Sequence, residues 1–243
     1  MYYVRQISQP ENEPVSLIEA KLFCRVSNAE EDSLIAGLIS AARVQAENAT
    51  GRCLAQRQFV LVLDRFNHSW HRHEAWIADD LFFNRNGQLN HEIKLPYSPL
   101  KSVDSIRYIA TDGTAVLLNP DTDFIVDRIS EPGRIFPPHG QRWPAALHVA
   151  NSIEITFTAG YDPNPSAEPD VHDIESATNQ QPDSTVLLAI PQTLRTAILA
   201  LTAGFYANRE PVAAGSVSKV PFNVEDLLAL ETIYDFCPTG SGR

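Results

Sequence analysis

The hydrophobic periodicity of this chain changes twice along its length, and these changes limit what it can fold into. Before Gly51, apolar residues recur at the three- and four-residue spacing of helices. Phe59–Leu63 is instead a continuous apolar run, typical of a strand covered on both faces. After Pro191 the helical spacing returns. This order predicts an α+β fold, in which a helical bundle is assembled from both chain ends and an antiparallel β subdomain is inserted between its halves.

The N-terminal part of the chain predicts two helices. Ser16 is followed three residues later by Glu19, which is the capping-box pattern of a helix start. Ser27 and Asn28 are candidate caps for a second helix of about 20 residues. Gly51 is expected to end that helix.

The middle of the chain predicts a small antiparallel sheet or barrel. Apolar residues at every second position lead up to Asp112-Gly113, a dipeptide that favours a β-hairpin turn. Further strands are expected near residues 115–118, 124–126, 133–136 and 153–157.

The C-terminal third combines an acidic segment with two more helices. Residues 162–189 hold six acidic side chains, four prolines and no Lys or Arg, so we expect an exposed, mobile acidic loop. Pro191 is expected at the first position of the third helix. A last short amphipathic helix is expected to run from Val224 to Tyr234. The expected organisation is N-terminal helices at 1–56, a β-rich subdomain at 57–161, the acidic loop at 162–189, and C-terminal helices with a docking tail at 190–243.

Charge and cysteine content exclude several classes of function. With 19 Lys and Arg against 30 Asp and Glu, the net charge is −11, which argues against a protein that grips DNA phosphates. No apolar run is long enough for a membrane span and no secretory signal is visible, so we expect a cytoplasmic protein without membrane contact. The three cysteines have neither disulfide-framework nor zinc spacing.

Motifs that carry chemistry are weak in this sequence. His68, His71 and His73, with Glu74, Asp79 and Asp80 nearby, are the best metal-ligand candidates, but a solvated polar loop is the favoured interpretation. Asp121, Asp123, Asp127 and Glu131 lack calcium-loop spacing and are interpreted as an acidic surface. No nucleophile elbow or phosphate-binding glycine loop occurs. We therefore expect no catalytic residues, no metal and no cofactor.

Two groups of residues remain as candidates for contacts. Arg52, Arg57, Arg65 and Arg72 form a basic series, for which salt bridges within the chain or to a partner are favoured over nucleic-acid contacts. The amphipathic segment containing Phe222 and Val224 follows a Gly-Ser connector, so it can dock into another protein or fold back on its own bundle.

Short motifs spread over residues 14–230 occur in an order that is typical of one family. They are PVSL at 14–17, EDSLI at 31–35, AAR at 41–43, TGR at 50–52, LDRF at 63–66, LP at 95–96, PLKSV at 99–103, GRI at 133–135, WP at 143–144, FTAGY at 157–161, YANRE at 206–210 and VPFNVEDLL at 220–228. In these motifs the chain resembles the head-tail connector (adaptor) proteins of long-tailed bacteriophages and gene transfer particles.

The resemblance implies a structural, non-enzymatic role. It implies a ring of about twelve copies beneath the portal protein, which continues the DNA channel, lets double-stranded DNA pass without specific binding, and presents a surface to the next neck, stopper or tail protein. The implied location is the virion neck, after a period in the host cytoplasm. A tail-completion or terminator ring component remains an alternative, as does a metal-dependent hydrolase that uses His71 and His73.

The resemblance also suggests contact residues. The C-terminal segment of the family tends to reach the portal, and its helices tend to build the ring. The portal-binding candidates are Phe222, Val224, Leu227, Leu228, Ile233 and Tyr234. The subunit-interface candidates are Arg43, Glu47, Arg52 and Arg209.

Overall fold

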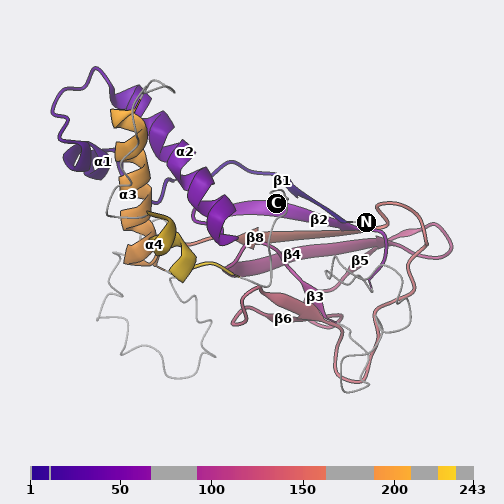
Figure 1. Ribbon diagram of the computed structural model, residues 1–243. Helices are drawn as coiled ribbons and strands as arrows, with labels where there is room; N and C mark the ends of the chain where they lie inside the picture. The colour runs from indigo at the N-terminus through magenta and orange to yellow at the C-terminus, as the bar shows by residue number, and fades with distance from the viewer. Residues whose placement is uncertain (1, 11, 67–91, 163–188, 209–223, 234–243) are drawn as a thin grey trace, which may run out of the picture. The chain divides into compact units, whose positions relative to one another are not determined.

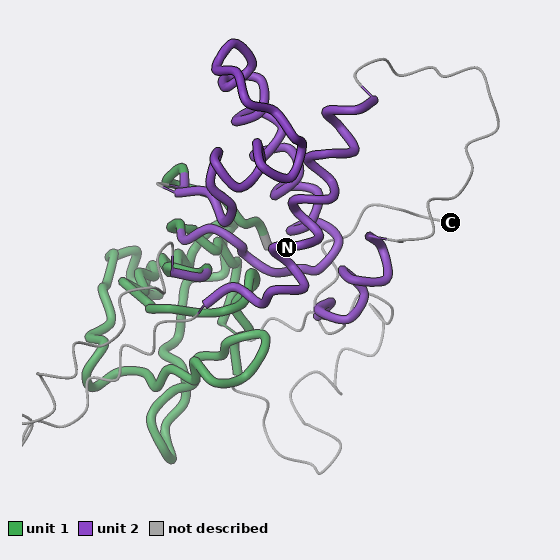
Figure 2. Tube along the Cα trace, turned by 90° about the vertical axis from the view of Figure 1, so that its left-hand side faces the viewer, with its two compact units in different colours: residues 1–9, 57–160 green, residues 10–56, 161–243 purple. Residues whose placement is uncertain are grey.

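The computed structural model describes residues 2–10, 12–66, 92–162, 189–208 and 224–233 (Figure 1). Helices and antiparallel sheets occur together in these ranges, which confirms the predicted α+β class. The chain divides into two compact units, and neither is a continuous segment (Figure 2). Unit 1 consists of residues 1–9 and 57–160, and unit 2 of residues 10–56 and 161–243.

Unit 1 is built on two antiparallel sheets. The larger sheet has the strand order β1-β2-β8-β4-β5 and the smaller one the order β3-β7-β6. In sequence order, the strands are β1 (Tyr2–Gln6), β2 (Arg57–Leu63), β3 (Ile93–Lys94), β4 (Leu100–Ile109), β5 (Ala115–Leu118), β6 (Ile125–Asp127), β7 (Arg134–Phe136) and β8 (Ile153–Ala159).

The core of unit 1 lies against the central strands β2 and β8. In β2, Val60 and Leu61 are both buried although they point to opposite faces, as the continuous apolar run predicts. Phe59 stacks on Tyr97 and Phe157, with ring centroids 4.5 Å and 5.5 Å apart. These aromatic contacts add to the burial of apolar surface in holding the sheet together.

The predicted hairpin joins β4 to β5. Gly113 has a φ of 87°, which the turn requires and which a residue with a side chain rarely adopts. The Asp112 carboxylate accepts hydrogen bonds from the Thr114 amide at 2.9 Å and from the Thr114 hydroxyl at 2.6 Å. Local turn chemistry therefore fixes this connection, and the hairpin prediction is confirmed.

Strand β1 is not predicted by the sequence. It pairs with β2 along its length, from Tyr2 opposite Leu63 to Gln6 opposite Phe59. As an edge strand it is only partly covered, and Tyr3 is exposed, so it lacks the apolar run that marks an interior strand. This pairing places β1 in unit 1, whereas the predicted organisation groups these residues with the helices at 1–56.

Unit 2 contains four described helices. They are α1 (Leu17–Cys24), α2 (Asp32–Thr50), α3 (Gln192–Ala207) and α4 (Val224–Leu230). None of these described helices combines the length and apolar composition that a membrane crossing requires. The helices share one buried core, whose members include Ala20, Ile35, Ile39, Ala42, Ala46, Leu194, Ala197, Ile198 and Leu228. Residues from distant parts of the sequence therefore complete each other's apolar faces.

The ends of the N-terminal helices follow local chemistry. At α1, the Ser16 hydroxyl accepts from the Glu19 amide and the Glu19 carboxylate accepts from the Ser16 amide, so the predicted capping box is confirmed. Gly51 ends α2 with a φ of 72°, also as predicted.

Two predicted helix starts need correction. The N-cap of α2 is Glu31, without a side-chain cap, so Ser27 and Asn28 lie too far upstream to cap it. Pro191 is the N-cap of α3, one position before the helix. Its missing amide hydrogen costs nothing there, because the amides at a helix start have no partner within the helix.

Candidate functional site

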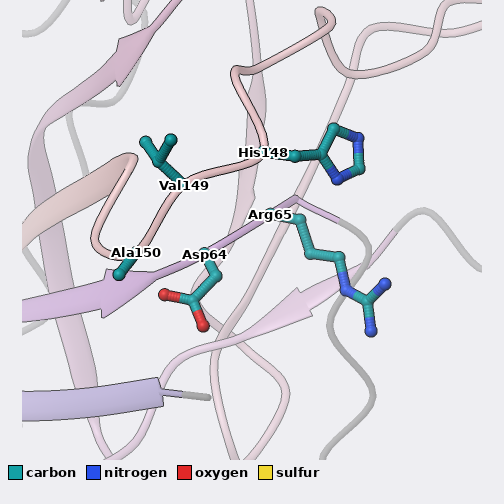
Figure 3. Close-up of a pocket in the computed structure, with 5 residues that line it drawn as sticks. All are labelled: Asp64, Arg65, His148, Val149 and Ala150. Carbon is teal, nitrogen blue, oxygen red and sulfur yellow. The ribbon is translucent and has the colours of Figure 1, made fainter.

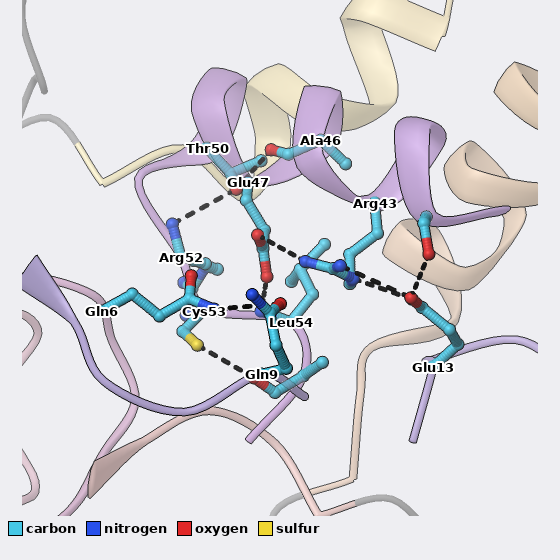
Figure 4. A network of polar contacts seen from close by, with 12 residues as sticks. Gln6, Gln9, Glu13, Arg43, Ala46, Glu47, Thr50, Arg52, Cys53 and Leu54 are labelled. Atoms are coloured by element: carbon cyan, nitrogen blue, oxygen red, sulfur yellow. Dashed lines mark hydrogen bonds and ion pairs between the residues drawn. The ribbon is translucent and has the colours of Figure 1, made fainter. Parts of the chain in front are cut away.

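A buried ion-pair network anchors the N-terminal segment of unit 2 to α2 (Figure 4). The Arg43 guanidinium lies 2.7 Å from one carboxylate oxygen of Glu13 and 3.0 Å from the carboxylate of Glu47. Glu47 also accepts a 2.9 Å hydrogen bond from the backbone amide of Leu54, and Ser40 donates to Glu13. Each charged group in the network is therefore matched by a partner.

Arg43 and Glu47 are expected at a subunit interface, but the structure places both inside unit 2, each 6% exposed. Burial disfavours the Arg43 charge, but hydrogen bonds and charges of Glu13 and Glu47 outweigh it and raise the pKa of Arg43 above its ordinary value. The guanidinium stays charged and bound, so these two side chains serve the fold of unit 2 in this arrangement.

Arg52 also binds within unit 2. Its Nε donates a 2.7 Å hydrogen bond to the carbonyl oxygen of Glu231, and its Nη1 donates to the Tyr161 hydroxyl at 3.1 Å. The amide of Ile233 donates to the carbonyl oxygen of Thr50 at 2.9 Å. The segment after α4 is thereby tied to the C-terminal end of α2.

The portal-binding candidates that the structure describes are buried or partly buried in unit 2. Leu228 is 5% exposed and Ile233 is 8% exposed. Val224 and Leu227 are partly buried and pack against the same cluster. Of the two alternatives for this segment, the structure shows α4 folded back onto its own helices, while Leu230 points outward with 76% of its surface exposed. The candidates Phe222, Tyr234 and Arg209 lie outside the described residues.

The basic series does not act as one group in the described residues. The Arg57 guanidinium lies over the Phe59 ring, 5.4 Å from its centroid, and is largely buried in unit 1. Arg65 is exposed after β2. Arg52 belongs to unit 2, and Arg72 lies outside the described residues.

Unit 1 contains an open hollow of about 310 Å³ (Figure 3). Asp64 and Arg65, which follow β2, line one side, and His148 to Ala150, which precede β8, line the other. The Asp64 carboxylate accepts a 3.0 Å hydrogen bond from the Asn151 amide, and its carbonyl oxygen accepts from Ser152 at 2.8 Å. Asp64 therefore holds the loop before β8 in place.

Two of the acidic residues at 121–131, Asp123 and Asp127, organise turns. Asp123 accepts from the Asn119 amide at 2.9 Å, and that hydrogen bond together with one from Thr122 lowers the pKa of Asp123. Asp127 accepts from the Ser130 hydroxyl at 2.6 Å and from Arg134 at 2.7 Å. These two carboxylates bind backbone and side-chain donors of their own turns.

The hydrogen bonds that the Asp127 carboxylate accepts hold an exposed loop after β6. Hydrogen bonds from the Ser130 hydroxyl and from Arg134 bring the pKa of Asp127 far below its usual range. Ile129 lies on this loop and is 95% exposed. The side-chain hydrogen bonds fix the loop's backbone and leave an apolar side chain in solvent.

The metal hypothesis rests on residues that the structure does not describe. His68, His71, His73, Glu74, Asp79 and Asp80 all lie in the range 67–91. In the described ranges, no three His, Cys, Asp or Glu side chains are grouped so as to hold a metal ion.

One exposed feature of unit 2 is not predicted from the sequence. Ile18 and Leu22 of α1 are 72% and 73% exposed, and Phe23 is 48% exposed. Apolar residues in a helical pattern are usually assigned to the core. In α1 only Ala20 is fully buried. The sequence pattern that indicates such an exposed apolar surface is a helix with apolar residues on more than one face.

Comparisons with known proteins give one family and one recurring fold. Residues 14–78 match the model of the family described as phage gp6-like head-tail connector protein. No curated protein matched the chain. The family match confirms the resemblance drawn from the motifs.

Three solved structures similar to this chain come from gene transfer agent particles. A chain in the neck of an empty particle, computed with C6 symmetry, has a TM-score of 0.64 at 19% identity and covers 95% of both chains. A chain in the virion of a native particle has a TM-score of 0.62 at 19% identity over 94% of both chains. A chain in the neck of a native particle, computed with C12 symmetry, has a TM-score of 0.62 at 18% identity and covers 95% of this chain and 94% of that one. At this identity the likeness shows a shared fold that extends over nearly the whole of both chains.

Proposed function

We propose that this chain, whose residues 14–78 match the gp6-like head-tail connector family, is a structural component of a virion neck. In this proposal it is a non-enzymatic adaptor that forms a ring beneath the portal, continues the DNA channel and offers a docking surface to the next neck or tail protein. The observation that carries the proposal is the fold shared over 95% of both chains with a protein in a gene transfer agent neck.

The helices are assigned to ring building. Helices from both chain ends meet in one core, and we propose that this bundle forms the body of the ring, while unit 1 is available for other neck contacts. Closed cyclic rings of about twelve copies need heterologous contacts, in which each copy uses two different surfaces.

The net charge supports passage of DNA. Each copy carries a net charge of −11, so a ring of copies is strongly acidic. An acidic channel repels phosphates and lets a duplex slide without specific binding. Assembly from the host cytoplasm into the virion neck then needs no DNA affinity.

Portal docking is assigned to the C-terminal segment. Because Leu228 and Ile233 are buried in unit 2, removing all of residues 221–243 would damage the core as well as any docking surface. A sharper change is Leu230→Asp combined with deletion of residues 234–243, which leaves the buried side chains of α4 in place.

The test is to mix the purified protein with its cognate portal protein and to weigh the complex by size-exclusion chromatography with light scattering. We expect co-migration at about twelve copies per portal, and loss of that complex in the Leu230→Asp deletion variant with unchanged circular dichroism. A protein that ignores the portal but joins the tail tube would be a tail-completion component. A monomer that holds stoichiometric zinc would revive the hydrolase alternative.

A further inference from the structure

The exposed side of α1 is apolar. Ile18 and Leu22 are one helical turn apart and are 72% and 73% exposed, and Phe23 beside them is 48% exposed. A single exposed apolar side chain is ordinary, but three on one eight-residue helix form a patch. These three residues are called the α1 patch below.

The exposed side of α2 carries no charged side chains between Ser33 and Ala49. Leu34, Gly37, Ala41 and Val44 are all exposed, and their spacing of three, four and three residues places them along one side of the helix. Leu34 is 39% exposed and Val44 is 45% exposed. At Gly37 a Cβ atom would meet nothing within 4 Å. These four residues are called the α2 face.

The charges of α2 are arranged opposite to those of an ordinary surface helix. Such a helix turns its charged residues to water and its apolar residues inward. Between Ser33 and Ala49, the charged residues of α2 are Arg43 and Glu47, both buried, and every exposed residue is uncharged. The hydration that charged side chains would provide is therefore missing along this side of the helix.

The charge of the whole chain indicates which partner fits these surfaces. Two copies with a net charge of −11 repel one another, so a contact between copies is favoured where neither brings a like charge. The α2 face meets this condition along its length. The α1 patch supplies large side chains, whereas the centre of the α2 face, at Gly37 and Ala41, supplies small ones, and large residues pack well into small ones at helix contacts.

Building on the proposed ring, we propose that the α1 patch of one copy packs against the α2 face of the next copy. The contact is heterologous, because the two surfaces differ, and it repeats from copy to copy until the ring closes. The occupant of the α2 face is thus a second copy of this chain.

Disulfide trapping between two differently tagged chains tests this contact. One chain carries Leu22→Cys and the other carries Ala41→Cys, both with Cys24→Ser and Cys237→Ser, while the buried Cys53 is kept. Because a disulfide forms only when the two Cα atoms come within about 7 Å, oxidation at high protein concentration reports close contact even when binding is weak. The control pairs Leu22→Cys with Leu117→Cys, an exposed apolar position in unit 1.

We expect the mixed 22–41 dimer to exceed the 22–22, 41–41 and 22–117 dimers several-fold. Purely statistical proportions of the 22–22, 22–41 and 41–41 dimers, or a 22–41 yield no higher than that of 22–117, would mean random collision and would overturn the proposal. A dominant 22–22 or 41–41 dimer, or the absence of any trapped dimer, would overturn it as well. Circular dichroism of each variant shows whether it is folded.

An introduced pair of opposite charges gives a second, independent readout in the portal-binding assay. Ala41→Glu is expected to abolish ring formation on the portal, because it places a carboxylate in an apolar contact. Adding Leu22→Lys to the same chain is expected to restore the ring, since this second substitution places an ammonium group opposite the new carboxylate of the next copy.

The two readouts separate the surface from the function. If the wild type forms a ring and Ala41→Glu leaves it intact, the surface is wrong while the proposed function stands. If 22–41 trapping succeeds and portal binding fails, the surface stands and the function is wrong.

Discussion

The backbone amide of Ile233 donates a 2.9 Å hydrogen bond to the carbonyl oxygen of Thr50. This bond joins the chain after α4 to the last residue of α2, and Arg52 reinforces it through the carbonyl oxygen of Glu231. The segment assigned to portal docking is thus also part of the structure of unit 2. The proposed docking role and the structural role of this segment can be separated by residue.

Leu228 and Leu230 separate these roles. Leu228→Ala removes a side chain that is 5% exposed and should lower the free energy of unfolding by about 2–5 kcal/mol. Leu230→Ala, at a position 76% exposed, should change it by no more than about 0.5 kcal/mol. Urea unfolding followed by circular dichroism measures both. Equal costs would show that α4 is not packed as described.

The start of α1 depends on the Ser16 hydroxyl. Ser16→Ala removes the acceptor of the Glu19 amide and should cost about 1 kcal/mol of unfolding free energy. Ser27→Ala is the matched control, because α2 begins after Glu31 and uses no side-chain cap. A cost at Ser27 as large as that at Ser16 would contradict the caps described, in the same denaturation measurement.

The network around Arg43 should be strongly non-additive. Arg43→Met leaves Glu47 and Glu13 without their cation and should cost about 3–5 kcal/mol. Glu47→Gln, combined with Arg43→Met, removes one of the stranded charges and should recover part of that loss. A double-mutant cycle measured by urea unfolding gives the coupling. A coupling free energy near zero would mean that the pair is not formed.

Asp127 should contribute stability that disappears in acid. Its pKa is lowered by folding, so its contribution is complete above the unfolded value of about 3.9 and is lost as pH falls below that value toward the folded pKa. The difference in stability between wild type and Asp127→Asn should therefore be constant near neutral pH and shrink below about pH 4. Unfolding measured from pH 7 to pH 2 tests this.

The matched control for Asp127 is the same comparison made in a Ser130→Ala background. That substitution removes the hydroxyl donor that contributes most to the lowered pKa of Asp127, so the loss of stability in acid should become smaller. An unchanged loss would show that the Ser130 hydroxyl is not its cause.

Two glycines should respond in opposite directions to an added methyl group. At Gly133 a Cβ atom would lie 2.5 Å from the Cβ of Leu100, so Gly133→Ala should cost about 1–3 kcal/mol. At Gly204, within α3, a Cβ atom would meet nothing within 4 Å, and Gly204→Ala should stabilise by about 0.5–1 kcal/mol. Thermal unfolding of both variants checks the signs. A stabilised Gly133→Ala would show that Leu100 does not pack there.

Local chemistry made much of the fold predictable. The Ser16 capping box, the stop at Gly51 and the turn at Gly113 each depend on a few neighbouring residues, and the structure has all three as predicted. Strand β1 could not be found in this way. Its pairing partner β2 follows only after two helices, and an edge strand carries little apolar periodicity of its own.

The candidate site was predicted less well than the fold. Arg43 and Glu47 look like surface charges in sequence, because a charged side chain is rarely buried. Their burial depends on Glu13, whose position opposite Arg43 follows from tertiary packing. In the same way, Ile18 and Leu22 fit a helical apolar pattern, and only the packed structure shows that their side of α1 is uncovered.

The register of β2 against β8 has a consequence for the order in which the chain folds. Arg57 lies opposite Ala159, so pairing of these two strands brings together the ends of the long chain segment that connects them. The entropic cost of closing that loop is therefore met when the sheet forms. It does not have to be met again when the flanking helices come together. Helix α2 is synthesised long before α3, so the part of its apolar side that α3 covers has no such cover in the meantime. A sheet that forms in this interval would shorten the effective chain between the two helices and so hasten their meeting.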